Sequence, residues 1–159
     1  MPDRGVTDRW DSPLDAAERV CRLLSRGPRP LRLDAREVGV DVPGRWVTTG
    51  ELLGMFSGLP SHTADLVWRS TAGHARAGDP RWRVVVAALA TGRLEAISRT
   101  VSRRSGVMTG ADAEAVVLAT FLIAADRVDI DAAGALSRAL AITRDEVLGG
   151  RPPRAPRGR

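Results

Sequence analysis

The sequence predicts an all-α protein: a compact bundle of about five to seven helices with one short extended or β segment near residues 30–47. Three observations lead to this prediction. Apolar residues recur at intervals of three and four over most of the chain, as they do on one face of a helix. Serine or threonine precedes several of these stretches at a position suited to cap a helix, and glycine or proline follows them. Strict alternation, the pattern of a strand, is confined to one short segment.

The first expected helix begins at Ser12-Pro13 and ends at Gly27-Pro28. The Ser12 hydroxyl can accept a hydrogen bond from an early backbone N–H, and proline suits the first turn because its missing N–H costs nothing there. The apolar stripe of this helix is Leu14, Ala17, Val20 or Cys21, and Leu24. Residues 29–47 then alternate around a turn at Pro43-Gly44, which predicts one or two short strands or an extended crossing.

Further helices are expected between residues 48 and 104. Thr48 and Glu51 have the spacing of a capping box, which predicts a short helix that stops near Gly58. Ser61 is expected to cap the next helix, whose apolar face is Ala64, Val67, Trp68, Thr71 and Ala75. Another helix begins at Asp79-Pro80, and Thr91-Gly92 is expected to break or bend it, because both residues lower helix propensity.

Two helices complete the expected domain. Thr109 predicts the start of a helix over 110–126 that is apolar on nearly all sides, which indicates the central helix of the bundle. Asp129 or Asp131 is expected to cap the last helix, which ends before Gly149-Gly150. Its inward residues are predicted to be Ala135, Leu136, Leu140, Ile142 and Val147.

Length and charge indicate one domain with two polar ends. A chain of 159 residues is expected to form a flexible arm (1–11), a single helical domain (12–150) and a disordered basic tail (151–159). All 24 basic residues are arginine, and lysine, asparagine, glutamine and tyrosine are absent, which is typical of a high-GC coding bias. Four units of the net charge of +5 lie in the tail, so the composition alone does not indicate nucleic-acid binding.

We expect a cytoplasmic protein without membrane contact. The single cysteine, Cys21, excludes an internal disulfide and fits a reducing compartment. The longest apolar run, residues 115–125, is well short of the ~20 residues that a membrane-spanning helix requires. The polar N-terminus lacks the apolar core of a signal peptide.

The sequence offers little for catalysis or for binding a metal or cofactor. His62 and His74 fall on different faces of any one helix, and Cys21 is remote from both, so we expect no metal. No serine or cysteine lies in a nucleophile elbow, and the glycines follow neither common phosphate-binding pattern. Asp112 and Glu114 are more simply helix-start carboxylates than paired catalytic acids. We therefore expect no cofactor and no enzymatic activity.

Residues 80–150 resemble the conserved helical region of the bacterial sigma factors, region 2, which binds RNA polymerase and melts promoters. The segment Asp112–Leu122 (D-A-E-A-V-V-L-A-T-F-L) resembles the family's pattern of Asp-Ala-Glu-Asp, two aliphatics, Gln-Glu, Thr-Phe and an aliphatic. Residues 89–104 are similar to the first helix of that region, and residues 136–145 to the helix that contacts promoter DNA. The layout also resembles a group of sigma-like proteins of unassigned role in high-GC actinobacteria.

The resemblance implies a non-enzymatic protein that acts in transcription or another DNA transaction through protein contacts, with the RNA polymerase core as a candidate partner. The candidate partner-binding residues are Asp112, Glu114, Val117, Leu118 and Phe121. The candidate DNA-binding residues are Arg138 and Arg144, together with Arg151, Arg154, Arg157 and Arg159 of the tail. A purely solubilising tail is an equally good interpretation of the last four.

The departures from the family pattern favour protein contact over promoter recognition. Ala115 replaces the fourth acid and Leu118-Ala119 replaces the Gln-Glu pair, polar residues that in the family dock on the polymerase. Aliphatic residues at these positions favour burial. The last helix also lacks the aromatic and basic cluster that captures a flipped promoter base. The alternative is a helical interaction or regulatory accessory protein, of a mobile element or a developmental pathway, with no direct DNA or polymerase partner.

Overall fold

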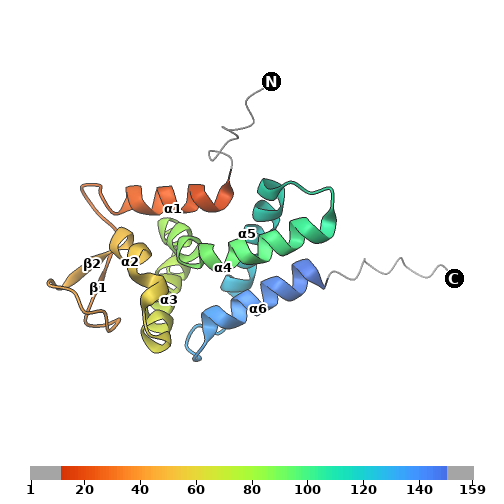
Figure 1. Ribbon diagram of the computed structural model, residues 1–159. Coiled ribbons are helices and arrows are strands. Elements are labelled where there is room, and N and C mark those ends of the chain that lie inside the picture. The colour runs from red at the N-terminus through yellow and green to blue at the C-terminus, as the bar shows by residue number, and fades with distance from the viewer. Residues whose placement is uncertain (1–11, 150–159) are drawn as a thin grey trace, which may run out of the picture.

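The computed structural model describes residues 12–149, which form an all-α bundle with a small two-stranded sheet, as the sequence predicts (Figure 1). The elements, in chain order, are α1 (Pro13–Leu24), β1 (Arg32–Asp34), β2 (Trp46–Thr48), α2 (Thr49–Met55), the 3₁₀ turn η1 (Phe56–Gly58), α3 (Ser61–Arg76), α4 (Arg81–Ser105), α5 (Gly110–Arg127) and α6 (Ala135–Leu148). The predicted arm at 1–11 and the predicted tail at 151–159 lie outside the described residues.

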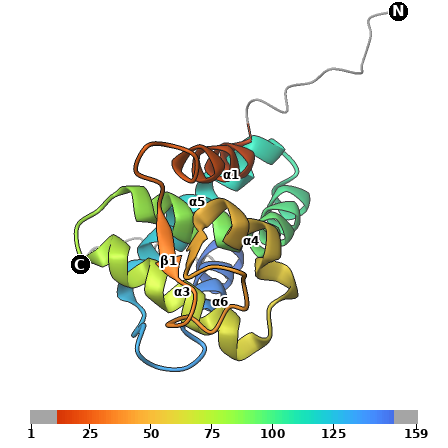
Figure 2. The same ribbon diagram turned by 90° about the vertical axis from the view of Figure 1, so that its left-hand side faces the viewer.

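The long helix α4 is the centre of the bundle. It packs against α1, α2, α3, α5 and α6 (Figures 1 and 2). Its buried residues include Trp82, Val85, Val86, Leu89, Leu94 and Val101. The prediction that the helix over 110–126 is central is wrong, because α5 buries one face and leaves Val116 and Ile123 43% and 49% exposed.

Of the break or bend predicted at Thr91-Gly92, the break is wrong, since α4 continues through both residues. The Thr91 hydroxyl donates to the carbonyl of Ala88 one turn back and to the carboxylate of Glu18 on α1. Contacts between helices therefore outweigh the low helix propensity of threonine and glycine.

Three helix starts follow the sequence prediction. The Ser12 hydroxyl accepts a hydrogen bond from the N–H of Asp15, and complete capping boxes join Thr48 to Glu51 and Thr109 to Asp112. At α3, the capping position is occupied by Pro60, so the predicted cap Ser61 is instead the first helical residue.

The last helix begins differently from the prediction. Gly134, in the left-handed conformation with φ 74°, precedes α6, and neither Asp129 nor Asp131 caps it. The Asp65 carboxylate on α3 accepts a hydrogen bond from the Gly134 N–H at 3.0 Å instead. A residue far away in the sequence thus supplies the acceptor that the sequence pattern assigned to a neighbour.

The segment near 30–47 forms an antiparallel pair in which Leu33 of β1 lies opposite Val47 of β2. Both side chains are buried, as are Leu31, Ala35, Val38 and Val40, so the predicted alternation is confirmed. In α1, Cys21 is buried while Val20 is exposed, and in α6 the predicted inward residue Ile142 is exposed.

Candidate partner-binding surface

Glu114, a predicted partner-binding residue, accepts hydrogen bonds from α1 and its N-cap. Its Oε2 accepts a hydrogen bond from the Ser12 hydroxyl and another, at 3.4 Å, from the N–H of Leu14. A carboxylate at the start of a helix is stabilised by the free backbone N–H groups there. Glu114 therefore joins α5 to α1, and its carboxylate is not presented to a partner.

Asp112 lies on the surface but already has a local role. Its Oδ2 accepts a hydrogen bond from the Thr109 hydroxyl at 2.7 Å, and its N–H donates to Thr109 Oγ1 at 3.1 Å. Asp112 therefore serves as a helix-start carboxylate, as the sequence indicates, and it is exposed at one end of α5.

Val117 and Phe121 are core residues with no exposed surface. The Phe121 ring packs against Trp68 of α3, with ring centroids 6.3 Å apart and the rings inclined at 56°. Leu118 is half-buried against the same core. The expectation that Val117 and Phe121 contact a partner is therefore corrected, because neither side chain can be reached without opening the bundle.

The accessible apolar residues of α5 lie on its opposite side. We define the α5 face as Ala115, Val116, Ala119 and Ile123, which are all exposed. Their spacing of three and four places them on one side of the helix. Asp112 lies at one end of the α5 face, and Asp126 and Arg127 lie at the other.

Sequence reasoning missed this face because α5 has no polar side to show which apolar residues turn outward. The signal that was available is the resemblance: Ala115 and Ala119 occupy positions at which the sigma pattern has polar, polymerase-docking residues. The structure places both of these alanines on the exposed side of α5.

Arg138, a candidate DNA contact, forms hydrogen bonds with the loop between α5 and α6. Its guanidinium donates to the carbonyl oxygens of Ala133 at 2.6 Å, Asp129 at 3.0 Å and Ala132 at 3.2 Å. Its role in this structure is to hold that loop. Arg144 is exposed on α6, and the four tail arginines lie outside the described residues.

Helix α3 supplies two more residues that fix the same loop and that the sequence analysis did not single out. Nη2 of Arg76 donates to the carbonyls of Ala125 and Val128, at 2.8 and 2.6 Å, where α5 ends. Asp65 lies nearer the start of α3, and its carboxylate accepts a hydrogen bond from the N–H of Gly134, where α6 begins. A cation at the carbonyl end of one helix and an anion at the N–H end of the next both match the helix dipoles.

The histidines do not form a catalytic arrangement in the described part of the chain. His74 stacks on Trp82, with ring centroids 4.6 Å apart. His62 lies near Asp65, whose carboxylate accepts a hydrogen bond from Gly134. Among the hydrogen bonds of residues 12–149, none joins the His62 side chain to the Asp65 side chain. Over the same range, no group of three histidine, cysteine or acidic residues is placed to hold a metal ion.

None of the helices between residues 12 and 149 combines the length and apolar character needed to cross a bilayer.

Comparison with known proteins found no match to a family model, to a curated protein or to a solved structure. The likeness to the sigma factors therefore stays a prediction from the sequence.

Proposed function

We propose that this is a non-enzymatic, sigma-factor-like cytoplasmic protein that binds the RNA polymerase core through the α5 face and so acts in transcription. The main observation in support is that Val116 and Ile123 form an exposed apolar stripe on α5, while the other side of this helix is buried in the core. The stripe lies on the helix whose sequence resembles the polymerase-binding helix of region 2.

The composition of the α5 face suits the centre of a protein interface. Two half-exposed aliphatic side chains are joined by two alanines, and charged residues lie only at the ends. Interface centres are depleted in charge and surrounded by a polar rim. Removing the remaining exposed surface of Val116 and Ile123 from water would contribute about 1 kcal/mol each.

DNA contact has a secondary place in the proposal. Arg138 is held by loop carbonyls, which leaves Arg144 and the tail arginines as the candidate contacts. If the four tail arginines neutralised four phosphates, the slope of log affinity against log salt would be about −3.6. Deleting residues 151–159 should then abolish DNA binding that persists in low salt, while polymerase binding stays unchanged.

The test is binding to purified, immobilised RNA polymerase core. Val116→Asp and Ile123→Asp place a charge on the α5 face at side chains that are about half-exposed, so both variants should fold and both should weaken binding by about tenfold or more. Leu23→Asp is the matched control, because Leu23 is a 66% exposed apolar residue on α1. Absent binding of the unmodified protein, or equal binding by the α5 variants, would refute the proposal.

One observation favours the alternative, an accessory interaction protein with neither polymerase nor DNA as partner. In an antiparallel pair of α5 helices centred between Ala119 and Thr120, Val116 of one copy would oppose Ile123 of the other. The same pairing sets Asp112 opposite Arg127, so opposite charges would meet at both ends of the face. Sedimentation showing a dimer that Val116→Asp dissociates, without polymerase binding, would select this alternative.

A further inference from the structure

A cleft of about 590 Å³ opens on a different side of α4 from α5, and none of its lining residues belongs to α5. Its walls come from α1, α2, η1, α3, α4 and α6, and combine apolar residues with the charged residues Glu18, Arg22 and Arg93. The apolar lining residues are Leu53, Phe56, Leu59, Ala64, Ala88, Leu89 and Leu136. Ligand-binding pockets for small molecules typically have volumes of about 300–1,000 Å³ and mostly apolar walls.

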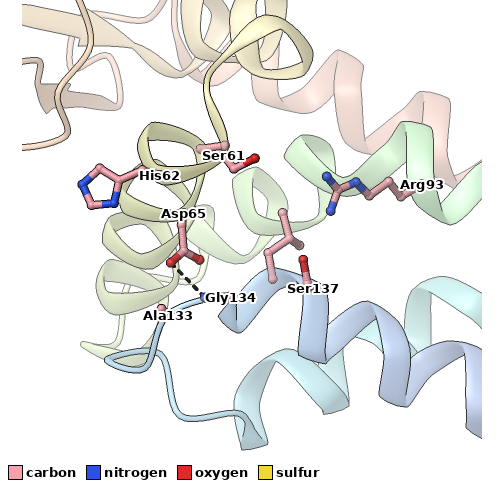
Figure 3. A pocket seen from close by; sticks show the side chains of 9 residues that line it. Ser61, His62, Asp65, Arg93, Ala133, Gly134 and Ser137 are labelled. Carbon is pink, nitrogen blue, oxygen red and sulfur yellow. Dashed lines mark hydrogen bonds between the residues drawn. The ribbon is translucent and has the colours of Figure 1, made fainter.

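The cleft continues into a second hollow of about 290 Å³, and five of the nine residues that line it are polar (Figure 3). The two spaces share Ser61, Ala64, Arg93 and Leu136 as lining residues. The second hollow adds the hydroxyl of Ser137 at the start of α6. An elongated ligand could therefore place an apolar body in the first space and a polar end in the second.

Arg93 lies where the two spaces meet. Figure 3 shows its side chain extending from α4 toward the space between Ser61 and Ser137. No hydrogen bond or ion pair joins its guanidinium to any residue in the described range 12–149.

The two acidic residues that line the cleft and the hollow already interact with other groups of the protein. Asp65 binds the N–H of Gly134, and Glu18 accepts a hydrogen bond from Thr91 and lies 4.0 Å from Arg22. The positive charge of Arg93 is thus left to attract an anion from solution.

Gly92 offers a position from which the cleft can be narrowed. It lies within α4 and lines the cleft, and a Cβ placed on it would meet nothing within 4 Å. Glycine inside a helix costs about 1 kcal/mol relative to alanine. At this position, the absence of a side chain leaves free space along one wall of the cleft.

We propose that the cleft binds a small amphipathic carboxylate, such as a medium-chain fatty acid. The carboxylate would pair with the guanidinium fork of Arg93, whose geometry matches two carboxylate oxygens, with Ser61 and Ser137 as further donors. The hydrocarbon chain would lie along Leu53, Phe56, Leu59 and Leu89. Arg93 supplies one positive charge, and Ser61 and Ser137 supply neutral hydroxyls. This set balances the single negative charge of a carboxylate better than the double negative charge of a phosphate. The proposal is independent of the α5 face.

The test is isothermal titration calorimetry of the full chain with decanoate below its micelle concentration. Decanol supplies the same body without the charge, acetate supplies the charge without the body, and decyl phosphate supplies a different anionic head. We expect decanoate to bind about tenfold or more tightly than each of the three. Tighter binding of decyl phosphate than of decanoate would overturn the assignment to a carboxylate.

Two variants and their matched controls locate the binding site. Arg93→Gln should weaken decanoate binding about tenfold or more and leave decanol binding unchanged, whereas Arg104→Gln, elsewhere on α4, should change neither. Gly92→Leu should weaken binding of both ligands by placing a side chain in the cleft. Gly73→Leu on α3, where a Cβ also meets nothing within 4 Å, should leave binding intact. Decanoate binding that survives both Arg93→Gln and Gly92→Leu, or that is absent from the unmodified protein, would refute the proposal.

Discussion

The carboxylate of Glu114 on α5 accepts a hydrogen bond from the hydroxyl of Ser12, a residue 102 positions away at the start of α1. The same hydroxyl accepts the N–H of Asp15, and the same carboxylate accepts the N–H of Leu14. The N-terminus of α1 is therefore capped by its own serine and by a carboxylate from another helix, which fixes the position of α1 on the bundle.

Glu114→Ala is predicted to lower the free energy of unfolding by about 1–3 kcal/mol, since it removes a charged acceptor from partly buried donors. The measurement is urea unfolding followed by tryptophan fluorescence. Glu95→Ala is the control: its carboxylate forms an exposed pair with Arg99 at 3.4 Å on α4, and losing such a pair costs about 0–1 kcal/mol. Equal effects of the two substitutions would contradict the role of Glu114.

Arg76→Gln is predicted to loosen the connection between α5 and α6. The guanidinium that binds the carbonyls of Ala125 and Val128 is lost, at a cost of about 1–2 kcal/mol. Hydrogen exchange of the amides in residues 128–134 should become faster, because that loop loses an anchor. Arg83→Gln removes only the half-exposed pair with Asp126 and should leave the exchange of the loop unchanged.

Phe121→Ala and Ile123→Ala should separate the two sides of α5. The first removes a fully buried ring that packs on Trp68, and we expect a loss of about 3–5 kcal/mol in the free energy of unfolding. The second shortens a half-exposed side chain and should cost less than about 1 kcal/mol. Thermal unfolding monitored by circular dichroism measures both. A large loss for Ile123→Ala would mean that the α5 face is already covered.

Acid is predicted to weaken the β1–β2 pair. A hydrogen bond from Arg45 Nε, at 2.8 Å, holds the pKa of the Asp34 carboxyl below its ordinary value. Because the pKa is lower in the folded state, this carboxylate stabilises the fold above about pH 4, and its contribution disappears as the pH falls through the folded pKa.

Asp34→Asn should therefore reduce the loss of stability between about pH 5 and pH 3, measured as the urea midpoint at each pH. Asp41→Asn, an exposed acid in the loop between the strands, is the control and should leave the pH profile as it is in the unmodified protein. The idea fails if the two variants have the same profile.

The sequence predicted the features that depend on neighbouring residues. Thr48 and Thr109 start helices because the hydroxyl, the backbone and an acid three residues later satisfy one another, and all of these groups lie within one turn. Leu33 and Val47 alternate with exposed residues because the period of a strand is fixed. The number and order of helices follow from such local patterns.

The features that the sequence did not predict depend on distant residues. Gly92 does not break α4, because Glu18 and the surrounding helices hold that turn in place. Asp65 replaces Asp129 or Asp131 at the start of α6, and nothing local distinguishes these three acids. In α5, Val117 and Val116 are equivalent by composition, so only the packing of α4 and α6 shows which of them is buried.

The β1–β2 pair consists of two edge strands, and a strand edge can recruit another extended chain. Each strand has only three residues, and the guanidinium groups of Arg32 and Arg45 lie over the Trp46 ring, 4.6 and 4.9 Å from its centre. An added strand could pair over at most three residues, next to two positively charged side chains. The hairpin is for this reason a poor template for the addition of another strand.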